Sequence, residues 1–323
     1  MPSKPSTPAI SPSRAQDFQQ CPLLFRFRVV DKLPEPPSLA AAKGTLVHKV
    51  LEHLFDLPAS ERTIDAALAH LPDAYRAVTE RDPSIPTLFA TESDRRAWLA
   101  EAETLLRTYF TLENPCGLAP AAREMFVQTD IALPDSQEAS DAEPQAGGTV
   151  PEGGTVAEGG TVPEDGAGDD GVAPAVPGRR RPLRLRGFID RLDVAPGSGA
   201  LRVVDYKTGK APNPRFQGKV KFQLDCYSLA LWRKRGAVPA MEQLIYMGSG
   251  DVLRFEPTQA ELEATEAQLV ALWESIERTA RSGTWPASRS RLCDWCHFQA
   301  QCPEFGGQTP PLPDDALARL GLA

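Results

Sequence analysis

Residues 187–209 read GFIDRLDVAPGSGALRVVDYKTG, and this stretch decides the fold. Apolar and polar residues alternate on both sides of APGSG at 195–199, which predicts two strands joined by a turn. If the hairpin is symmetric about Gly197 and Ser198, Asp190 falls opposite Asp205, and both share one sheet face because side chains alternate with period two. That register also predicts the pairs Leu192–Val203 and Val194–Leu201 on this face, and Asp193–Arg202 and Arg191–Val204 on the other, wetter face.

Two apposed carboxylates on an otherwise apolar face need a counter-charge. Like charges directly across a strand pair destabilise a sheet, and half-buried carboxylates are costly unless they are paired or bind a metal. A divalent cation removes the repulsion, and hard oxygen ligands without a thiolate favour magnesium or manganese. Lys207, two residues after Asp205, could then orient a water or stabilise the charge of a phosphoryl transition state. The alternative is an exposed hairpin with solvated charges.

The formal net charge of the 323-residue chain is −8, which by itself argues against a nucleic-acid partner. Residues 134–178, however, hold ten acidic residues and neither Lys nor Arg. Without them the chain has 35 basic and 33 acidic residues, a net charge of +2 that is compatible with DNA. The chain is long enough for one large or two small domains.

Residues 134–178 form a low-complexity segment with three imperfect hexapeptides, GGTVPE, GGTVAE and GGTVPE, from 147 to 164. Three short repeats without aromatic residues predict a flexible acidic insertion in a hairpin loop. Five arginines follow, at 179–181, 184 and 186. They would suit a phosphate backbone, and equally a partner for the acidic segment.

Periodicity predicts the remaining elements. Residues 1–10 are expected to be disordered, and a helix to run from about Ser13 through Phe18 to Cys21. Further helices are expected at 40–55, 63–70, 93–111, 222–235 and 258–281, and further strands at 122–133, 242–247 and 252–255. Residues 56–121 form a helical insert in this scheme, and 304–323 a peripheral tail.

Two helices and one strand carry candidate site residues. His48 lies at i+4 from Gly44 on one helix face, and Gln223 and Tyr227 are related in the same way on another helix. From the residues alone, His48 is more readily a satisfied helical histidine than a metal ligand. Glu124 is the acidic residue of the 122–133 strand that could reach the site.

Cysteine usage indicates a soft-metal site. Cys293, Cys296 and Cys302 form a C-x2-C-x5-C cluster, which rarely arises from packing alone. Zinc could bind these thiols together with His297, although that residue directly follows Cys296 and is awkwardly placed for the same ion. Alternatively, an iron–sulfur cluster could take the three thiols and a distant fourth cysteine. The N-terminus lacks an apolar signal region and no stretch has transmembrane length, so a cytoplasmic protein without a membrane partner is expected.

Six motifs together resemble the RecB-type nuclease family of the PD-(D/E)XK superfamily. In chain order they are SPSRAQDFQQCP at 11–22, GTLVH at 44–48, GFIDRLD at 187–193, VVDYKTG at 203–209, QLDCY at 223–227 and CDWCHFQAQC at 293–302. The combination resembles stand-alone iron–sulfur exonucleases, CRISPR-associated adaptation nucleases and the nuclease domain of AddB. The resemblance covers residues 11–303 apart from the helical insert and the acidic segment.

The resemblance implies an α/β restriction-endonuclease-like core, a central mixed sheet flanked by helices, and a division of labour within it. Asp190 and Asp205 would bind Mg2+ or Mn2+ with His48 and the Tyr206 main-chain carbonyl, and Lys207 would polarise a metal-activated water. Gln223 and Tyr227 would support the site or contact the DNA backbone. One 4Fe–4S cluster would join the two ends of the nuclease domain through four cysteines: Cys21, Cys293, Cys296 and Cys302.

The implied activity is metal-dependent hydrolysis of DNA, most often exonucleolytic on single strands, in repair or recombination. The alternatives are a CRISPR spacer-processing nuclease with integrase partners and a non-catalytic iron–sulfur subunit that binds DNA. The sequence contains no GxxxxGK[ST] motif, so unwinding would require a helicase or repair partner. Cys116 and Cys226 match no motif and are expected to be ordinary thiols.

Overall fold

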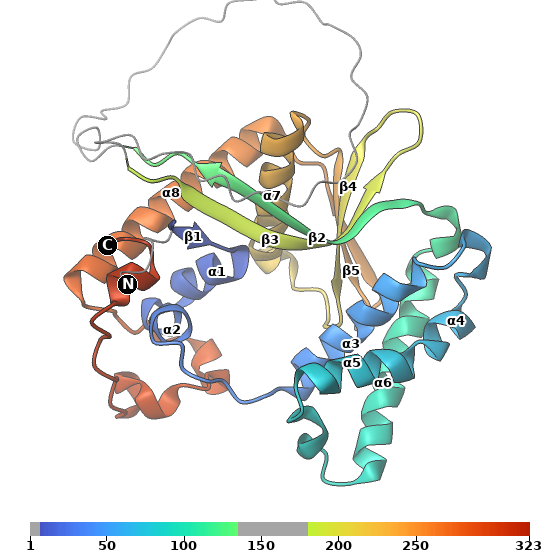
Figure 1. Cartoon of the computed structure of the whole chain (residues 1–323), viewed down its shortest axis with the longest axis horizontal. Helices are drawn as coiled ribbons and strands as arrows, with labels where there is room; N and C mark the ends of the chain where they lie inside the picture. Colours follow the sequence, from blue (N-terminus) through green and yellow to red (C-terminus); the bar gives the residue numbers. More distant parts are fainter. Residues whose placement is uncertain (1–6, 135–179) are drawn as a thin grey trace, which may run out of the picture.

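The computed structural model describes residues 7–134 and 180–323, and within them the core is one six-stranded mixed sheet. The strand order is β1-β3-β4-β5-β6, and the sixth strand, β2, also pairs with β3 (Figure 1). β1 runs parallel to β3 and β4 parallel to β5, whereas the other pairs are antiparallel. The strands are β1 (Ala9–Ile10), β2 (Pro120–Ile131), β3 (Leu183–Val194), β4 (Leu201–Lys207), β5 (Met241–Tyr246) and β6 (Asp251–Phe255).

Helices cover both faces of this sheet, which confirms the predicted α/β class. On one face, α3 packs with α5 and α6 against Val204, Tyr206 and Ile245. On the other, α7 packs against Val203 and Leu244 and in turn contacts α8. The α-helices are α1 (Pro12–Gln20), α2 (Pro22–Phe25), α3 (Leu39–Leu54), α4 (Ile64–Ala69), α5 (Leu71–Arg81), α6 (Glu92–Leu112), α7 (Gln217–Arg235), α8 (Gln259–Ser282) and α9 (Ala316–Arg319).

Local signals explain where most helices begin. Ser11 and Ser38 accept hydrogen bonds at the N-termini of α1 and α3, and full capping boxes start α6 at Thr91 and α8 at Thr258. A left-handed glycine, Gly236, ends α7. α5 falls in the connection that was expected to be helical within the insert, although its bounds were not predicted, and α7 begins five residues earlier than expected.

The hairpin register is confirmed over its four observed pairs. Leu192 pairs with Val203 and Val194 with Leu201, and the two pairs predicted for the other face also form. The expectation that this other face is the wetter one is wrong. Arg191 and Val204 are fully buried there because α3, together with α6 of the helical insert, covers this face.

Both ends of the chain are more ordered than expected. Residues 9–10 were assigned to a disordered terminus, yet they form β1 beside Arg184 and Leu185, and Ile10 is fully buried. The segment 304–323 is not peripheral, since Leu320 is buried in the main core. The predicted acidic loop, residues 134–178, lies outside the described residues except for Pro134.

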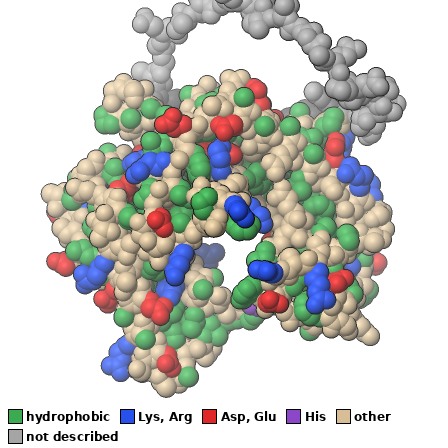
Figure 2. Space-filling view, turned by 180° about the vertical axis from the view of Figure 1, so that it is seen from behind, with side chains coloured by type: hydrophobic (Ala, Val, Ile, Leu, Met, Phe, Trp, Pro, Cys, Tyr) green, Lys and Arg blue, Asp and Glu red, His purple; other side chains and the backbone are tan. Residues whose placement is uncertain are grey.

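The molecule is hollowed right through. Figure 2 shows the opening, with Lys and Arg side chains at its edge. In Figure 1 it is framed by β2 and β3, by α1 and α2, by α3, and by the segment that connects α2 to α3. Among the described residues, no helix is long and apolar enough to cross a membrane.

Candidate active site

One group of metal-ligand type stands out at the centre of the sheet. The donor atoms of His48 on α3, Glu124 on β2 and Asp190 on β3 all lie within 4.8 Å of one another. Glu124 has a φ of 45°, an unusual left-handed conformation for a residue other than glycine. Backbone strain of this kind clusters at functional sites, so we interpret the bend at Glu124 as part of the site.

His48 links α3 to both central strands. Its Nε2 lies 3.0 Å from the Tyr206 carbonyl oxygen, and its Nδ1 lies 3.5 Å from Asp190 Oδ1. Burial alone would lower the pKa of His48, but the hydrogen bond and charge of Asp190, together with Asp205 and Glu124, raise it to about 9. Three carboxylates thus surround one imidazole, and this excess of negative charge is what a cation site requires.

Asp205 lies beside this group and belongs to a second set of polar contacts. Its carboxylate is 2.7 Å from Lys207 Nζ and accepts a 3.1 Å hydrogen bond from Gln223 Nε2. Gln223 also accepts a 3.1 Å bond from Lys207 Nζ and donates a 2.9 Å bond to the Tyr227 hydroxyl. The fold therefore brings Asp205, Lys207, Gln223 and Tyr227 into one connected cluster. Sequence spacing predicted the neighbours within each pair, Asp205 with Lys207 and Gln223 with Tyr227, but not the contact between the pairs.

The negative charges of Asp205 and Glu124 are only partly neutralised by nearby positive groups. Burial and then the charge of Asp190 raise the pKa of Asp205 to about 6, although Lys207 opposes the shift. Burial and then Asp190 also raise the pKa of Glu124. A hard divalent cation would offset both effects, so the donor set fits Mg2+ or Mn2+.

The compact donor group differs from the predicted one in a single member. It contains Glu124, which was only a candidate, and omits Asp205, which contacts Lys207 and Gln223 instead. The Tyr206 carbonyl, which was expected to bind the metal, lies 3.0 Å from His48 Nε2. Gly44 imposes no tight approach near His48, since an added Cβ would meet Thr208 at an ordinary 3.6 Å.

A buried arginine supports the site from the α3 side, and the sequence analysis missed it. Arg191 makes two hydrogen bonds of 2.7 and 2.8 Å to Glu113, a third of 2.7 Å to the Tyr206 hydroxyl, and an ion pair with Asp193. Although burial opposes the shift, the Arg191 guanidinium lowers the pKa of Glu113. The network ties α6 to the residues next to Asp190 and Asp205. An arginine within the apolar alternation of 187–194 was the available signal.

A close contact fixes α7 over β3. A Cβ added to Gly187 would lie 2.5 Å from the Tyr227 ring, so only glycine lets this ring approach the strand. The Tyr227 hydroxyl holds Gln223, which in turn bonds Asp205. Gly187 therefore positions part of the site indirectly.

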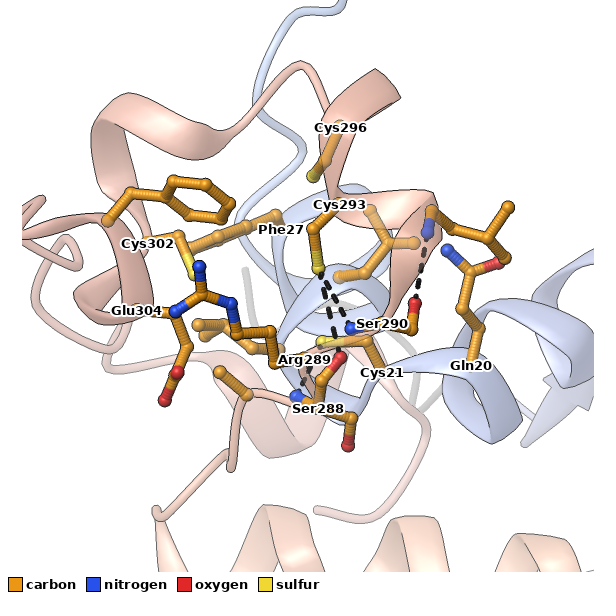
Figure 3. A pocket seen from close by; sticks show the side chains of 15 residues that line it. Gln20, Cys21, Phe27, Ser288, Arg289, Ser290, Cys293, Cys296, Cys302 and Glu304 are labelled. Atoms are coloured by element: carbon orange, nitrogen blue, oxygen red, sulfur yellow. Dashed lines mark hydrogen bonds between the residues drawn. The ribbon is translucent and has the colours of Figure 1, made fainter.

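The four motif cysteines line one cavity between α2 and the C-terminal segment. Figure 3 shows the side chains of Cys21, Cys293, Cys296 and Cys302 around a common space. The backbone N–H groups of Ser288 and Ser290 donate 3.4 Å hydrogen bonds to the sulfurs of Cys21 and Cys293. These thiols do not meet the 4.8 Å spacing that the His48 group meets. Tetrahedral zinc needs sulfurs about 4 Å apart, given Zn–S bonds of about 2.3 Å.

The basic residues that follow the acidic segment are partly engaged. Arg180 pairs with Glu277, and Arg184 forms a 2.8 Å ion pair with Asp130. Arg179 lies outside the described residues. The interpretation of the whole arginine run as a phosphate-binding stretch is therefore too broad, because these two side chains already have carboxylate partners.

The fold and site define a class: an α/β protein whose mixed sheet brings carboxylates, a histidine and a lysine together at its centre. The chain belongs to the PD-(D/E)XK nuclease superfamily, whose family model matches residues 9–303. The superfamily that the motifs predicted is thereby confirmed.

Two individual proteins are also similar to this chain. The Gene 69 protein of Mycobacterium phage L5 is 28% identical over 126 residues, which are 38% of this chain and 41% of the phage protein. The chain thus spans well under half of that relative's length. A crystal structure of a candidate exonuclease from Eubacterium rectale superposes with a TM-score of 0.49 and 12% identity, covering 89% of this chain and 86% of that one.

Proposed function

We propose that this protein is a metal-dependent DNA nuclease, a single-strand exonuclease acting in DNA repair or recombination. The observation that carries the proposal is the grouping of His48, Glu124 and Asp190 within 4.8 Å, beside the Asp205–Lys207 pair. The superfamily membership supports hydrolysis of a nucleic acid as the reaction.

The residues divide the work by chemistry. His48, Asp190 and Glu124 would hold Mg2+ or Mn2+ together with Asp205 and the Tyr206 carbonyl. When bound, the metal would make a water nucleophilic at neutral pH and stabilise the charge that develops on the phosphate. Lys207, held by Asp205 and Gln223, would orient that water, and its ammonium would stabilise the same developing charge. Gln223 and Tyr227 would hold Asp205 and Lys207 in place.

The shape of the molecule supports a strand that enters by its end. α3 and β3, which carry His48 and Asp190, both border the opening in Figure 1, and Lys and Arg side chains lie at its edge in Figure 2. A basic edge attracts a polyanion, and a closed opening favours a substrate with a free terminus.

We further propose that Cys21, Cys293, Cys296 and Cys302 hold one 4Fe–4S cluster. Their side chains share a cavity, and sulfurs that accept backbone N–H bonds suit a thiolate-ligated cluster. The thiols are spaced more widely than the His48 donor group, which favours a multi-iron cluster over zinc. Such a group would close a loop of more than 270 residues and so stabilise the fold.

Two rival functions make different predictions. A non-catalytic DNA-binding subunit would bind DNA without cutting it, and the carboxylates grouped around His48 argue against this role because they repel phosphate. A CRISPR spacer-processing nuclease shares the chemistry but needs integrase partners. The non-catalytic subunit leaves unexplained why carboxylates with raised pKa values gather around His48.

The test is degradation of end-labelled single-stranded DNA with Mg2+ or Mn2+, using anaerobically purified protein. We expect cleavage that stops in chelator and is lost in Asp205→Ala, with a product ladder that gives the polarity. Binding without any cleavage by the wild-type protein would refute the catalytic proposal and favour the DNA-binding subunit.

A further inference from the structure

Two exposed phenylalanines lie next to the proposed metal site on the same two strands. Phe126 on β2 and Phe188 on β3 are register partners, and their ring centroids are 5.3 Å apart. Their side chains are 46% and 55% exposed, although both residues lie in central parts of long strands. Large aromatic rings gain little from exposure to water, so an exposed pair suggests a ligand.

The pair faces the side on which the metal-ligand group lies. Gly187 points toward Tyr227 on α7, so the alternating neighbour Phe188 points away from α7. The opposite face is the one that α3 covers farther along the sheet, and α3 supplies His48. Toward the site, Glu124 lies two residues before Phe126 on β2, and Asp190 lies two residues after Phe188 on the antiparallel strand β3. At about 3.4 Å per residue, that separation is about 7 Å along each strand.

A positive side chain without an ion-pair partner among the described residues lies on β3 beyond Phe188. Arg186, two residues before Phe188, is exposed and forms no ion pair with another described residue. The neighbouring pair Arg184–Asp130 is, in contrast, already neutralised.

We propose that Phe126 and Phe188 form a stacking platform for unpaired nucleobases, and that Arg186 holds an adjacent phosphate of the same strand. A separation of about 7 Å from the metal-ligand group corresponds to about two nucleotides at a stacked rise of 3.4 Å. Base–aromatic stacking tolerates any sequence because every base has a π-face, and it requires bases that are free of a complementary strand. The inference rests on the proposed nuclease function and assigns the residues that would bind the bases of its single-stranded substrate.

The test is binding of a fluorescein-labelled single-stranded oligonucleotide, measured by anisotropy in EDTA so that cleavage cannot intervene. Phe126→Leu/Phe188→Leu keeps the apolar surface and removes the rings, and we expect binding to weaken about 10- to 100-fold. Leu88→Ala, an exposed apolar residue in the helical insert, is the matched control and should bind as the wild type does. Thermal denaturation would verify that both variants are folded.

Two further arms identify the ligand group. An oligonucleotide of abasic sites should bind the wild type as weakly as the normal strand binds the leucine variant, because it offers phosphates without bases. Arg186→Gln should reduce the slope of log K against log salt by about 1, as expected for one lost phosphate contact.

The outcomes separate this inference from the proposed function. A leucine variant that binds within twofold of the wild type overturns the stacking platform, even if the protein is a nuclease. A leucine variant that binds normally but loses self-association shows that the rings contact a second copy, and also overturns it. Weakened binding in a protein that never cleaves DNA supports the platform and refutes the nuclease.

Discussion

The backbone N–H of Tyr206 donates a 2.6 Å hydrogen bond to Asp190 Oδ2. The observed β3–β4 pairs end one position earlier, at Arg191 and Val204, so Asp190 uses its side chain to reach β4. The carbonyl of Tyr206 lies 3.0 Å from His48. One peptide segment therefore positions two proposed ligands through its main chain.

Removing Arg191 should destabilise the whole protein. Arg191→Leu leaves Glu113 buried without its bidentate partner, which costs about 3–5 kcal/mol for pairs of this kind. We expect a lower urea midpoint, measured by circular dichroism. Arg191→Leu/Glu113→Leu should be less damaging than either single change. Additive losses in the double variant would contradict a coupled buried pair.

Gly187→Ala should disturb the site through Tyr227. The added methyl group would push the ring away, and overpacking of this kind costs about 1–3 kcal/mol. Because Tyr227 holds Gln223, we also expect slower DNA cleavage at saturating substrate. Gly117→Ala is the control, since nothing lies within 4 Å of a Cβ there. Wild-type stability and rate in Gly187→Ala would show that the Tyr227 contact is unimportant.

A buried carboxyl group on β5, that of Glu242, should make the stability of the protein depend on pH. Burial and then the charge of Asp225 raise the pKa of Glu242 to about 8, while its side chain accepts a 2.6 Å hydrogen bond from Ser228. The folded state therefore binds more protons than the unfolded state between about pH 4.5 and 8, and stability falls as the pH rises through this range.

Glu242→Gln should remove most of that dependence. We expect the variant to match the wild type near pH 5 and to exceed it near pH 8.5 by about 1–2 kcal/mol, a value reduced from about 1.4 kcal/mol per pKa unit because Asp225 shares the charge. Melting temperatures across this pH range measure the effect. The exposed Glu256→Gln is the control, and a wild-type pH profile in Glu242→Gln would contradict the assignment.

Loss of one motif cysteine should remove bound iron. The proposed cluster predicts about four irons and four acid-labile sulfides per chain, brown colour and absorbance near ~400 nm in the wild type. Cys21→Ser should lose these and melt at a lower temperature, whereas the exposed Cys116→Ser should keep both. Stoichiometric zinc in a colourless wild-type protein would contradict the cluster.

The register of the β3–β4 hairpin and the contact between Gln223 and Tyr227 could be predicted because both depend on local sequence patterns. Alternation gave the pairs Leu192–Val203 and Val194–Leu201, and i,i+4 spacing brought Gln223 to Tyr227. The motif resemblance added His48 and Cys21, whose partners lie far away in the sequence.

Tertiary packing decided what the local patterns could not. The alternation at Arg191 indicated a polar face, but α6 covers that face and supplies Glu113, a partner 78 residues away. The left-handed bend at Glu124 has no signal in its residue type, so its place beside Asp190 could not be derived. Local patterns likewise gave no reason to expect β1 at residues 9–10, because this strand forms by pairing with Arg184 and Leu185 of β3, far away in the sequence.

The most direct test of the central claim measures the release of nucleotides from end-labelled single-stranded DNA in Mg2+. It compares the wild type with Asp190→Asn and Asp130→Asn. Asp130 lies on β2 in an ion pair with Arg184 and is the matched control. We predict metal-dependent release by the wild type and Asp130→Asn, and a loss of at least about 100-fold in Asp190→Asn. Equal release by Asp190→Asn, or release that persists in chelator, would contradict a metal-dependent site at His48, Glu124 and Asp190.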